Sequence, residues 1–201
     1  MTRPVPTPDL VDRLLAIIDS AILPLTRSGV AKGNKIFGAA LLHKSDWSLL
    51  LAETNNEIES PLWHGEMHAL KRYHELPPHT RPAPDELIFL STHEPCSLCM
   101  SAITWAGFDN FFYFFSHEDS RDAFAIPHDL KILKEVFDVN PGEYRSTNAF
   151  WDSHAIQQLA SSFTDEKQSS RENMVERIIE QYKTLSDDYQ ISKDDNHIPL
   201  N

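Results

Sequence analysis

His64-Gly65-Glu66 and Pro95-Cys96-Ser97-Leu98-Cys99 are the two segments that decide how this chain folds. Each is expected to lie at the start of a helix. The first helix is predicted over residues 64–74 and the second over residues 95–106, and residues 87–91 form an apolar run typical of a strand. The sequence therefore predicts two helix starts that flank one buried strand.

The regions on either side extend this pattern into an alternation of helices and strands. Residues 8–23 have apolar positions at helical spacing, and Pro24 is expected to end that helix. The remaining expected strands are 36–42, 47–54 and 110–115, and the remaining expected helices are 119–124, 130–137, 148–163 and 171–185. This order predicts an α/β fold, a three-layer α/β/α sandwich with a central mixed sheet.

One histidine and the only two cysteines of the chain form a candidate metal site. His64, Cys96 and Cys99 can converge on one tetrahedral Zn²⁺ and leave its fourth position to water, as in a catalytic zinc site. Three alternatives stay open for the cysteines: a disulfide, a redox C-x-x-C pair, or buried thiols. A closed structural zinc site would need a fourth ligand from elsewhere.

Glu66 is the candidate proton shuttle. It lies two residues beyond His64, on the first turn of the predicted helix. From there its carboxylate can reach a water molecule at the metal without ligating the metal. Such a group can accept a proton from water and then donate protons to a ring nitrogen and a departing amine.

The motif H-x-E…P-C-x-x-C is the signature of zinc deaminases. With it, the chain resembles the cytidine/deoxycytidylate deaminase superfamily over residues 33–137. The segments Gly33-Asn34-Lys35-Ile36-Phe37-Gly38-Ala39 and Cys99–Trp105 are similar to the guanine deaminase and yeast-type cytosine deaminase branch. The dipeptide Gly65-Glu66, where many relatives have Ala-Glu, is more like yeast-type cytosine deaminases.

This resemblance implies a cytidine deaminase-like fold and a zinc-dependent hydrolase that acts on C–N bonds of cyclic amidines. The expected reaction converts an exocyclic amine of a purine or pyrimidine base, guanine favoured, to a carbonyl and releases ammonia. The resemblance also implies substrate contacts by Asn55, with Asn56 as the alternative, by Trp105, and by Asp129, which a small insertion shifts from the directly aligned Pro127. It further implies a homodimer paired through the helices beside the zinc sites, and C-terminal residues that close the pocket. The alternatives are a cytosine, nucleoside or tRNA adenosine deaminase, or a catalytically silent zinc-binding interaction subunit.

Composition and charge narrow the class of partner. The formal net charge is −12 and no cluster of Lys and Arg is visible, which argues against a nucleic-acid partner and leaves a small nucleobase-like substrate. No apolar run approaches the roughly 20 residues that cross a bilayer, and no signal peptide is visible, so a cytoplasmic protein is expected. Residues 1–142 are expected to form the deaminase core and residues 143–201 a helical extension, with a polar and flexible end from residue 186.

Overall fold

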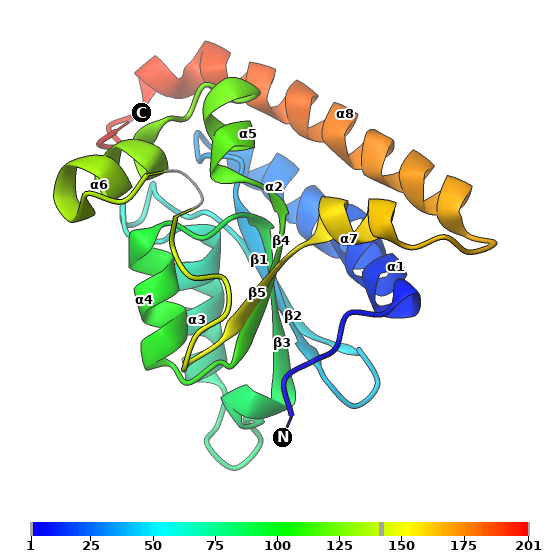
Figure 1. Cartoon of the computed structure of the whole chain (residues 1–201). Helices are drawn as coiled ribbons and strands as arrows, with labels where there is room; N and C mark the ends of the chain where they lie inside the picture. The colour runs from blue at the N-terminus through cyan, green and yellow to red at the C-terminus, as the bar shows by residue number, and fades with distance from the viewer. Residues whose placement is uncertain (1, 141–142, 201) are drawn as a thin grey trace.

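A five-stranded sheet lies at the centre of the chain in the computed structural model, which describes residues 2–140 and 143–200 (Figure 1). The strands are β1 (Gly38–His43), β2 (Leu49–Thr54), β3 (Leu87–His93), β4 (Asn110–Phe115) and β5 (Asp152–Ala155). The helices are α1 (Pro8–Ile17), α2 (Leu23–Val30), α3 (Gly65–Glu75), α4 (Ser97–Trp105), α5 (His117–Asp122), α6 (His128–Phe137), α7 (Ile156–Ser162) and α8 (Gln168–Ser192), together with a π-helical segment η1 (Ile18–Ile22) and two short 3-10 segments, η2 (Pro84–Glu86) and η3 (Lys193–Asp195).

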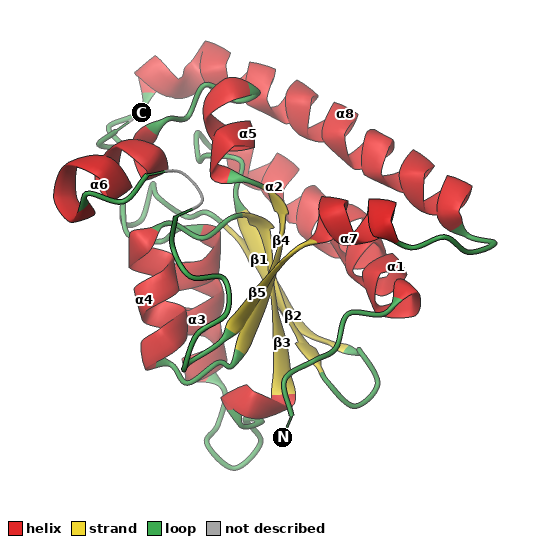
Figure 2. Cartoon of the chain, in the orientation of Figure 1, coloured by secondary structure: helices red, strands yellow, loops and turns green. Residues whose placement is uncertain are grey.

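The sheet is mixed and covered on both faces. Its order is β2-β1-β3-β4-β5; β1 is antiparallel to β2 and β3, whereas β3, β4 and β5 run parallel. Helices α3 and α4 cover one face, and α1, α2, α7 and α8 cover the other (Figures 1 and 2). The predicted three-layer α/β/α sandwich is therefore confirmed.

The period-2 geometry of the strands divides the apolar side chains between two cores. On β1, Ala39 and Leu41 pack towards α3 and α4, while Ala40 and Leu42 pack towards α1 and α8. The same alternation runs along β3 and β4, which have helices on both faces and so consist almost entirely of apolar residues.

Three expectations for the flanking segments were wrong. Pro24 does not end the first helix: the π-helical segment η1 leads directly into α2, and Pro24 occupies one of its first two positions, where a missing N–H costs little. Residues 152–155 are a strand rather than part of a helix, because they pair with β4. The end of the chain is not an unstructured tail, since α8 continues to Ser192 and Tyr189 is fully buried.

The topology brings both predicted helix starts to the carboxyl ends of the parallel strands. The chain leaves β3 at His93 and reaches Cys96 before α4 begins, and α3 begins at Gly65 beside the first residue of β1, Gly38. In open α/β sheets, ligands bind in the crevice outside these strand ends. In the described part of the chain, every helix is too short or too polar to cross a membrane. The expected domain division at residue 142 falls outside the described residues and stays a prediction.

Candidate metal centre and adjoining cavity

The metal-ligand candidates sit at the first residues of two helices. His64 is the residue before α3, Cys96 is the residue before α4, and Cys99 lies on the first turn of α4. Both residues that precede a helix have the non-helical backbone angles typical of a position just before the first helical turn. Both thiols lie at the N-terminus of α4, where the positive end of the helix dipole favours thiolates.

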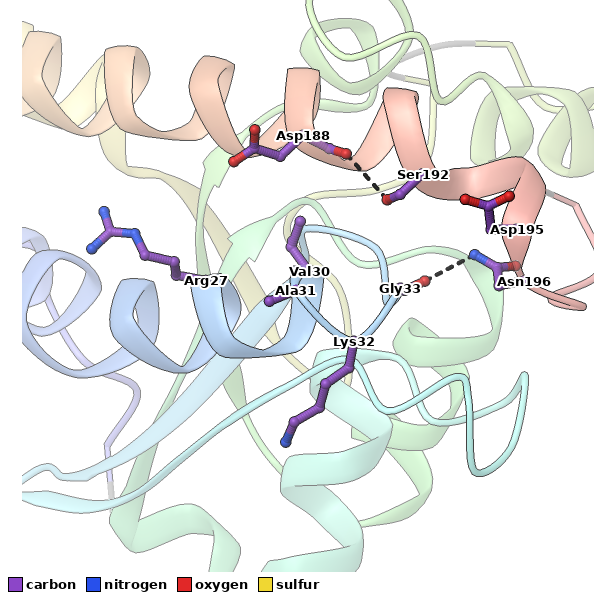
Figure 3. A pocket seen from close by; sticks show the side chains of 9 residues that line it. All are labelled: Arg27, Val30, Ala31, Lys32, Gly33, Asp188, Ser192, Asp195 and Asn196. Atoms are coloured by element: carbon purple, nitrogen blue, oxygen red, sulfur yellow. Dashed lines mark hydrogen bonds between the residues drawn. The ribbon is translucent and has the colours of Figure 1, made fainter.

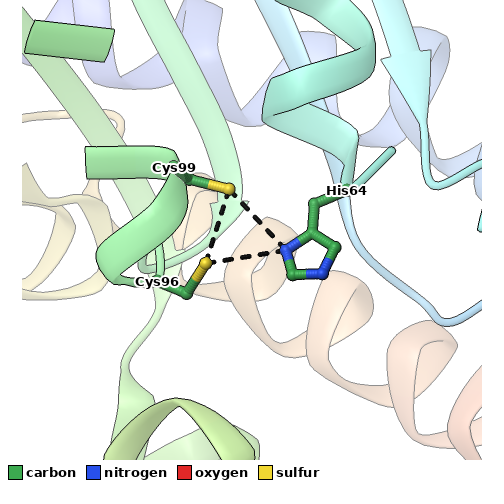
Figure 4. Close-up of side chains that lie close together, drawn as sticks. All are labelled: His64, Cys96 and Cys99. Carbon is green, nitrogen blue, oxygen red and sulfur yellow. Dashed lines mark hydrogen bonds between the residues drawn. The ribbon is translucent and has the colours of Figure 1, made fainter. Parts of the chain in front are cut away.

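The three ligand atoms form a triangle of the size that zinc requires (Figure 4). His64 Nδ1 lies 3.6 Å from Cys96 Sγ and 3.7 Å from Cys99 Sγ, and the two sulfurs are 3.6 Å apart. Tetrahedral zinc, with bonds of about 2.3 Å to sulfur and about 2.0 Å to nitrogen, would separate these atoms by about 3.5–3.8 Å. Both cysteines are free thiols, so the disulfide alternative is wrong, and the donor set fits zinc.

Glu66 lies directly beside this triangle and is buried. Its Oε2 is 3.5 Å from Cys99 Sγ, and its Oε1 is 2.8 Å from Ser91 Oγ. Burial raises the pKa of Glu66, and the negative charge of Cys96 raises it further, while the positive charge of His64 opposes both. A carboxyl group with a raised pKa at this place can both accept and donate a proton.

Ser91 gives Glu66 a partner in either protonation state. Its hydroxyl oxygen is 2.8 Å from Glu66 Oε1 and 2.6 Å from the carbonyl oxygen of His93, but it carries a single hydrogen. When Glu66 is ionised, Ser91 can donate to it. When Glu66 is protonated, Glu66 can donate to Ser91, which then donates to the His93 carbonyl. Sequence reasoning missed Ser91, because the contact of Ser91 with Glu66 depends on how the strands and helices pack.

A cavity of about 330 Å³ opens beside the metal centre. Its wall is mostly apolar, and the carboxyl group of Asp129 faces it from the first turn of α6. Burial raises the pKa of Asp129 to about 7, reinforced by the charge of Cys96 and opposed by those of His117 and His64. The structure thus brings Asp129 to the cavity. The full lining is Lys35, Phe37, Glu57, Pro61, Leu62, His64, Cys96, Ser97, Leu98, Ile126, His128, Asp129, Ile132, Pro199 and Leu200.

A larger depression of about 430 Å³ lies elsewhere, between the end of α2 and the end of α8 (Figure 3). None of His64, Cys96 and Cys99 lines it, so its size does not make it the reactive site. It does show how the end of the chain is fixed: Asn196 Nδ2 donates to the carbonyl oxygen of Gly33 at 3.0 Å. This bond holds the segment that leads to Pro199 and Leu200, which line the cavity at the metal centre.

Asn55 and Trp105 lie outside the cavity wall. Asn55 is buried just after β2, where its Oδ1 accepts from the Gly65 N–H at 2.5 Å and its Nδ2 donates to Glu57 Oε2 at 2.9 Å. It fixes the start of α3 and the orientation of Glu57. Trp105 is 91% exposed on the last turn of α4. Nine residues of helix, about 13 Å, separate it from Cys96, so within one chain its ring does not reach the cavity.

Lys35 and Glu57 are cavity residues that sequence reasoning missed. Their side chains form an ion pair, with Lys35 Nζ 2.9 Å from Glu57 Oε1, and both are almost completely buried. A charged residue in a loop is usually solvated, so neither attracts notice alone. Their positions in the sequence could have indicated them: Lys35 lies in the family-like segment Gly33–Ala39, and Glu57 follows the candidate substrate contact Asn55 by two residues.

Comparison with known proteins gives the family and the fold. Residues 14–115 match the family model of the cytidine and deoxycytidylate deaminase zinc-binding region. No curated protein matches the chain.

Solved structures resemble the chain at low sequence identity. Guanine deaminase from Nitrosomonas europaea is 18% identical, with a TM-score of 0.50 over 92% of this chain and 96% of that one. Guanine deaminase from Bacillus subtilis is 23% identical, with a TM-score of 0.50 over 84% and 92%. A point-mutant protein in complex with 8-azaguanine is 18% identical, with a TM-score of 0.55 over 92% and 97%. These likenesses show a shared fold, and the family match, which spans just over half of the chain, confirms the expectation from the sequence. The chain belongs to the cytidine and deoxycytidylate deaminase family and contains its zinc-binding region.

Proposed function

We propose that the chain is a zinc-dependent hydrolytic deaminase of a purine or pyrimidine base, with guanine the favoured substrate. The observation that carries this proposal is the placement of the buried Glu66 carboxyl group beside the triangle of His64, Cys96 and Cys99. A purely structural zinc site has no use for such a group. This placement also speaks against a catalytically silent subunit.

The reaction consumes one water and one cyclic amidine and gives a carbonyl and ammonia. Zinc at this site would lower the pKa of a water molecule towards about 7 and so supply the nucleophile. Glu66 accepts the proton that the water loses and passes it to the ring nitrogen next to the attacked carbon. It then delivers the second water proton to the departing amine, and the C–N bond breaks. Ser91 stabilises Glu66 in both states through the hydroxyl described above.

The cavity favours a small substrate over a polynucleotide. Its apolar wall includes Leu62, Leu98 and Ile132, and Pro199 and Leu200 close it from the end of the chain. Asp129 is proposed to contact the substrate, since it faces the same space beside Cys96. Guanine is favoured because the proteins that share the fold over most of this chain include two guanine deaminases. The net charge of −12 adds to the case against a tRNA substrate.

A homodimer is part of the proposal. On α4, Leu98 and Trp105 are seven residues apart and so lie on one face of the helix, and both are exposed, Trp105 almost completely. An exposed tryptophan on a helix beside the metal centre fits an interface between two copies of the chain.

Ammonia release by the purified protein tests the proposal. Wild type and Glu66→Gln are compared, both with measured zinc content, on guanine, cytosine, adenine, their nucleosides and aminated triazines. Release by wild type alone, with equal zinc in both proteins, is the expected result. If zinc is present at one equivalent and none of these compounds is turned over, the proposal fails for small heterocycles, and a polynucleotide substrate or a silent subunit takes its place.

A further inference from the structure

The ion pair between Lys35 and Glu57 occupies an unusual place for two charges. Both side chains are buried, with exposed fractions of 6% and 2%, and both line the cavity at the metal centre. Lys35 is the sole Lys or Arg among the residues that line this cavity in the described part of the chain. Burying two charges is costly unless their bonding capacity is used. The pair therefore needs an explanation.

Glu57 lines the cavity, and its two carboxylate oxygens have different partners. Its Oε2 accepts from the Lys35 backbone N–H at 3.2 Å and from Asn55 Nδ2 at 2.9 Å. Its Oε1 accepts from Lys35 Nζ at 2.9 Å and lies 3.9 Å from His64 Nε2. A carboxylate oxygen can accept a second hydrogen bond, so Oε1 has capacity left at a point close to a metal ligand.

The Lys35 ammonium group also has unused capacity. It carries three N–H donors, and among the described residues it has one acceptor, Glu57 Oε1. A partly buried lysine pair at the other end of β1 is a useful contrast: Lys44 Nζ has three acceptor atoms, the two carboxylate oxygens of Asp109 at 2.7 and 2.8 Å and the Thr2 carbonyl oxygen at 3.4 Å. The Lys44–Asp109 pair is complete by itself, whereas the Lys35–Glu57 pair is not.

We propose that Lys35 and Glu57 together select substrates that contain a lactam, a ring carbonyl next to a ring N–H. Lys35 donates to the carbonyl oxygen, and Glu57 Oε1 accepts from the adjacent N–H. A donor and an acceptor held 2.9 Å apart match the acceptor and donor of a lactam. This inference rests on the proposed deaminase function and names the chemical class of its substrate: free bases such as guanine and cytosine qualify, and adenine, which has no ring carbonyl, does not.

Pairs of substrates that differ only in the lactam give the sharpest test. Guanine and 2-aminopurine carry the same amine on the same carbon, but 2-aminopurine lacks both the carbonyl and the adjacent N–H. Cytosine and 4-aminopyrimidine form the equivalent pyrimidine pair. The measured quantity is the ratio of kcat/KM for the lactam to that for its partner, on whichever pair the wild type turns over. Because the intrinsic reactivities of the two compounds differ, the change in this ratio between protein variants is what counts.

The test variant is the double substitution Lys35→Met with Glu57→Gln, which removes both charges together and leaves no buried charge unpaired. The matched control is Lys44→Met with Asp109→Asn at the opposite end of the sheet. We expect the lactam ratio to fall at least 10-fold in the test variant, in line with the loss of charge-assisted hydrogen bonds, and to stay within about threefold of wild type in the control. The rate on 2-aminopurine or 4-aminopyrimidine should change little in either variant.

Binding separates recognition from turnover. In a Glu66→Gln background, guanine should bind at least 10-fold more tightly than 2-aminopurine, and the Lys35→Met/Glu57→Gln substitutions should remove that difference. An unchanged lactam ratio in a folded, zinc-loaded test variant would overturn the inference while leaving the deaminase function intact. So would a wild type that turns over adenine as readily as guanine. If zinc-loaded wild type releases ammonia from no heterocycle, the proposed function fails and the inference falls with it.

Discussion

Gly65 is the residue at which the packing of the site is tightest, and Gly65→Ala should damage stability and activity together. A Cβ added to Gly65 would lie 2.6 Å from Gly38 Cα and 2.8 Å from Gly38 N, both backbone atoms of β1. Gly38 cannot retreat, since Thr92 Oγ1 bonds both its N–H and its carbonyl oxygen, and Ile22 packs on it from the other side. The start of α3 must therefore move.

The size of that movement follows from the contact distances. An ordinary van der Waals contact begins at 3.4 Å and the added Cβ would lie at 2.6 Å, so the α3 start must move by about 0.8 Å. Overpacking of this kind costs about 1–3 kcal/mol of unfolding free energy. His64 and Glu66 flank Gly65 and would move with it. Ligand distances at a metal site tolerate shifts of about 0.2 Å, and a displacement of about 1 Å at a reactive site can reduce turnover about 100-fold.

Three measurements check this prediction: urea unfolding of the zinc-saturated protein, competition for zinc with a chromophoric chelator, and ammonia release. Gly29→Ala is the matched control. Its added Cβ would meet a side-chain methyl of Thr54 at 3.1 Å, which can give way, and alanine is the better helix former by about 1 kcal/mol. If Gly65→Ala unfolds within about 0.5 kcal/mol of wild type and keeps normal zinc affinity and turnover, the contact between β1 and α3 is not rigid and the reasoning fails.

Four further predictions follow from the site and its surroundings. Cys96→Ser should lose zinc and unfold at a lower temperature, because metal binding is coupled to folding; one equivalent of zinc in the purified variant would refute the ligand assignment. Glu66→Gln should keep zinc and fold but lose turnover by about 100-fold or more, and near-normal ammonia release would exclude the shuttle role. Burial lowers the pKa of His93 well below its ordinary value, so below about pH 6.5 the unfolded chain gains a proton that the folded chain does not bind. The contribution of His93 to the free energy of unfolding should be fully present above that pH and should fall by up to about 1.4 kcal/mol per pH unit below it. In urea titrations of the zinc-saturated protein, His93→Phe should reduce this slope, and the exposed control His79→Gln should leave it unchanged. Trp105→Glu should convert the proposed dimer to a monomer in light scattering after gel filtration, and a wild type that is already monomeric would refute the interface.

The candidate metal centre could be predicted from the sequence because its geometry is local. The two-residue offset from His64 to Glu66 and the three-residue offset from Cys96 to Cys99 each lie within one helix turn, so their relative positions depend little on the rest of the fold. The remaining unknown was whether the two helix starts meet, and that follows from their order around β3. The three-layer architecture could be predicted for the same reason, since each element carries its own periodicity.

The parts that could not be predicted depend on contacts between distant segments. Residues 152–155 have no strong strand pattern and become a strand by pairing with β4. At the other end of the molecule, α8 extends past residue 185 because Tyr182 and Tyr189 continue one buried stripe against the sheet. Pro24 lies inside a continuous helical region because η1 precedes it, and no local pattern distinguishes a π-helical segment from an α-helix.

The difference between local spacing and long-range contacts also separates the residues proposed for chemistry from those proposed for substrate selection. The residues that would perform hydrolysis are fixed by short spacings at the starts of two helices. The residues that would choose the substrate come from four distant places. Lys35 and Glu57 meet across 22 positions, Asp129 comes from α6, and Leu200 arrives from the far end of the chain. Asn55 links the metal centre to the proposed substrate-selecting pair. Its Oδ1 accepts from the Gly65 N–H beside the ligand His64, and its Nδ2 donates to Glu57. A substitution at Asn55 should therefore disturb turnover and substrate selection together, whereas the paired substitution of Lys35 and Glu57 should alter selection alone.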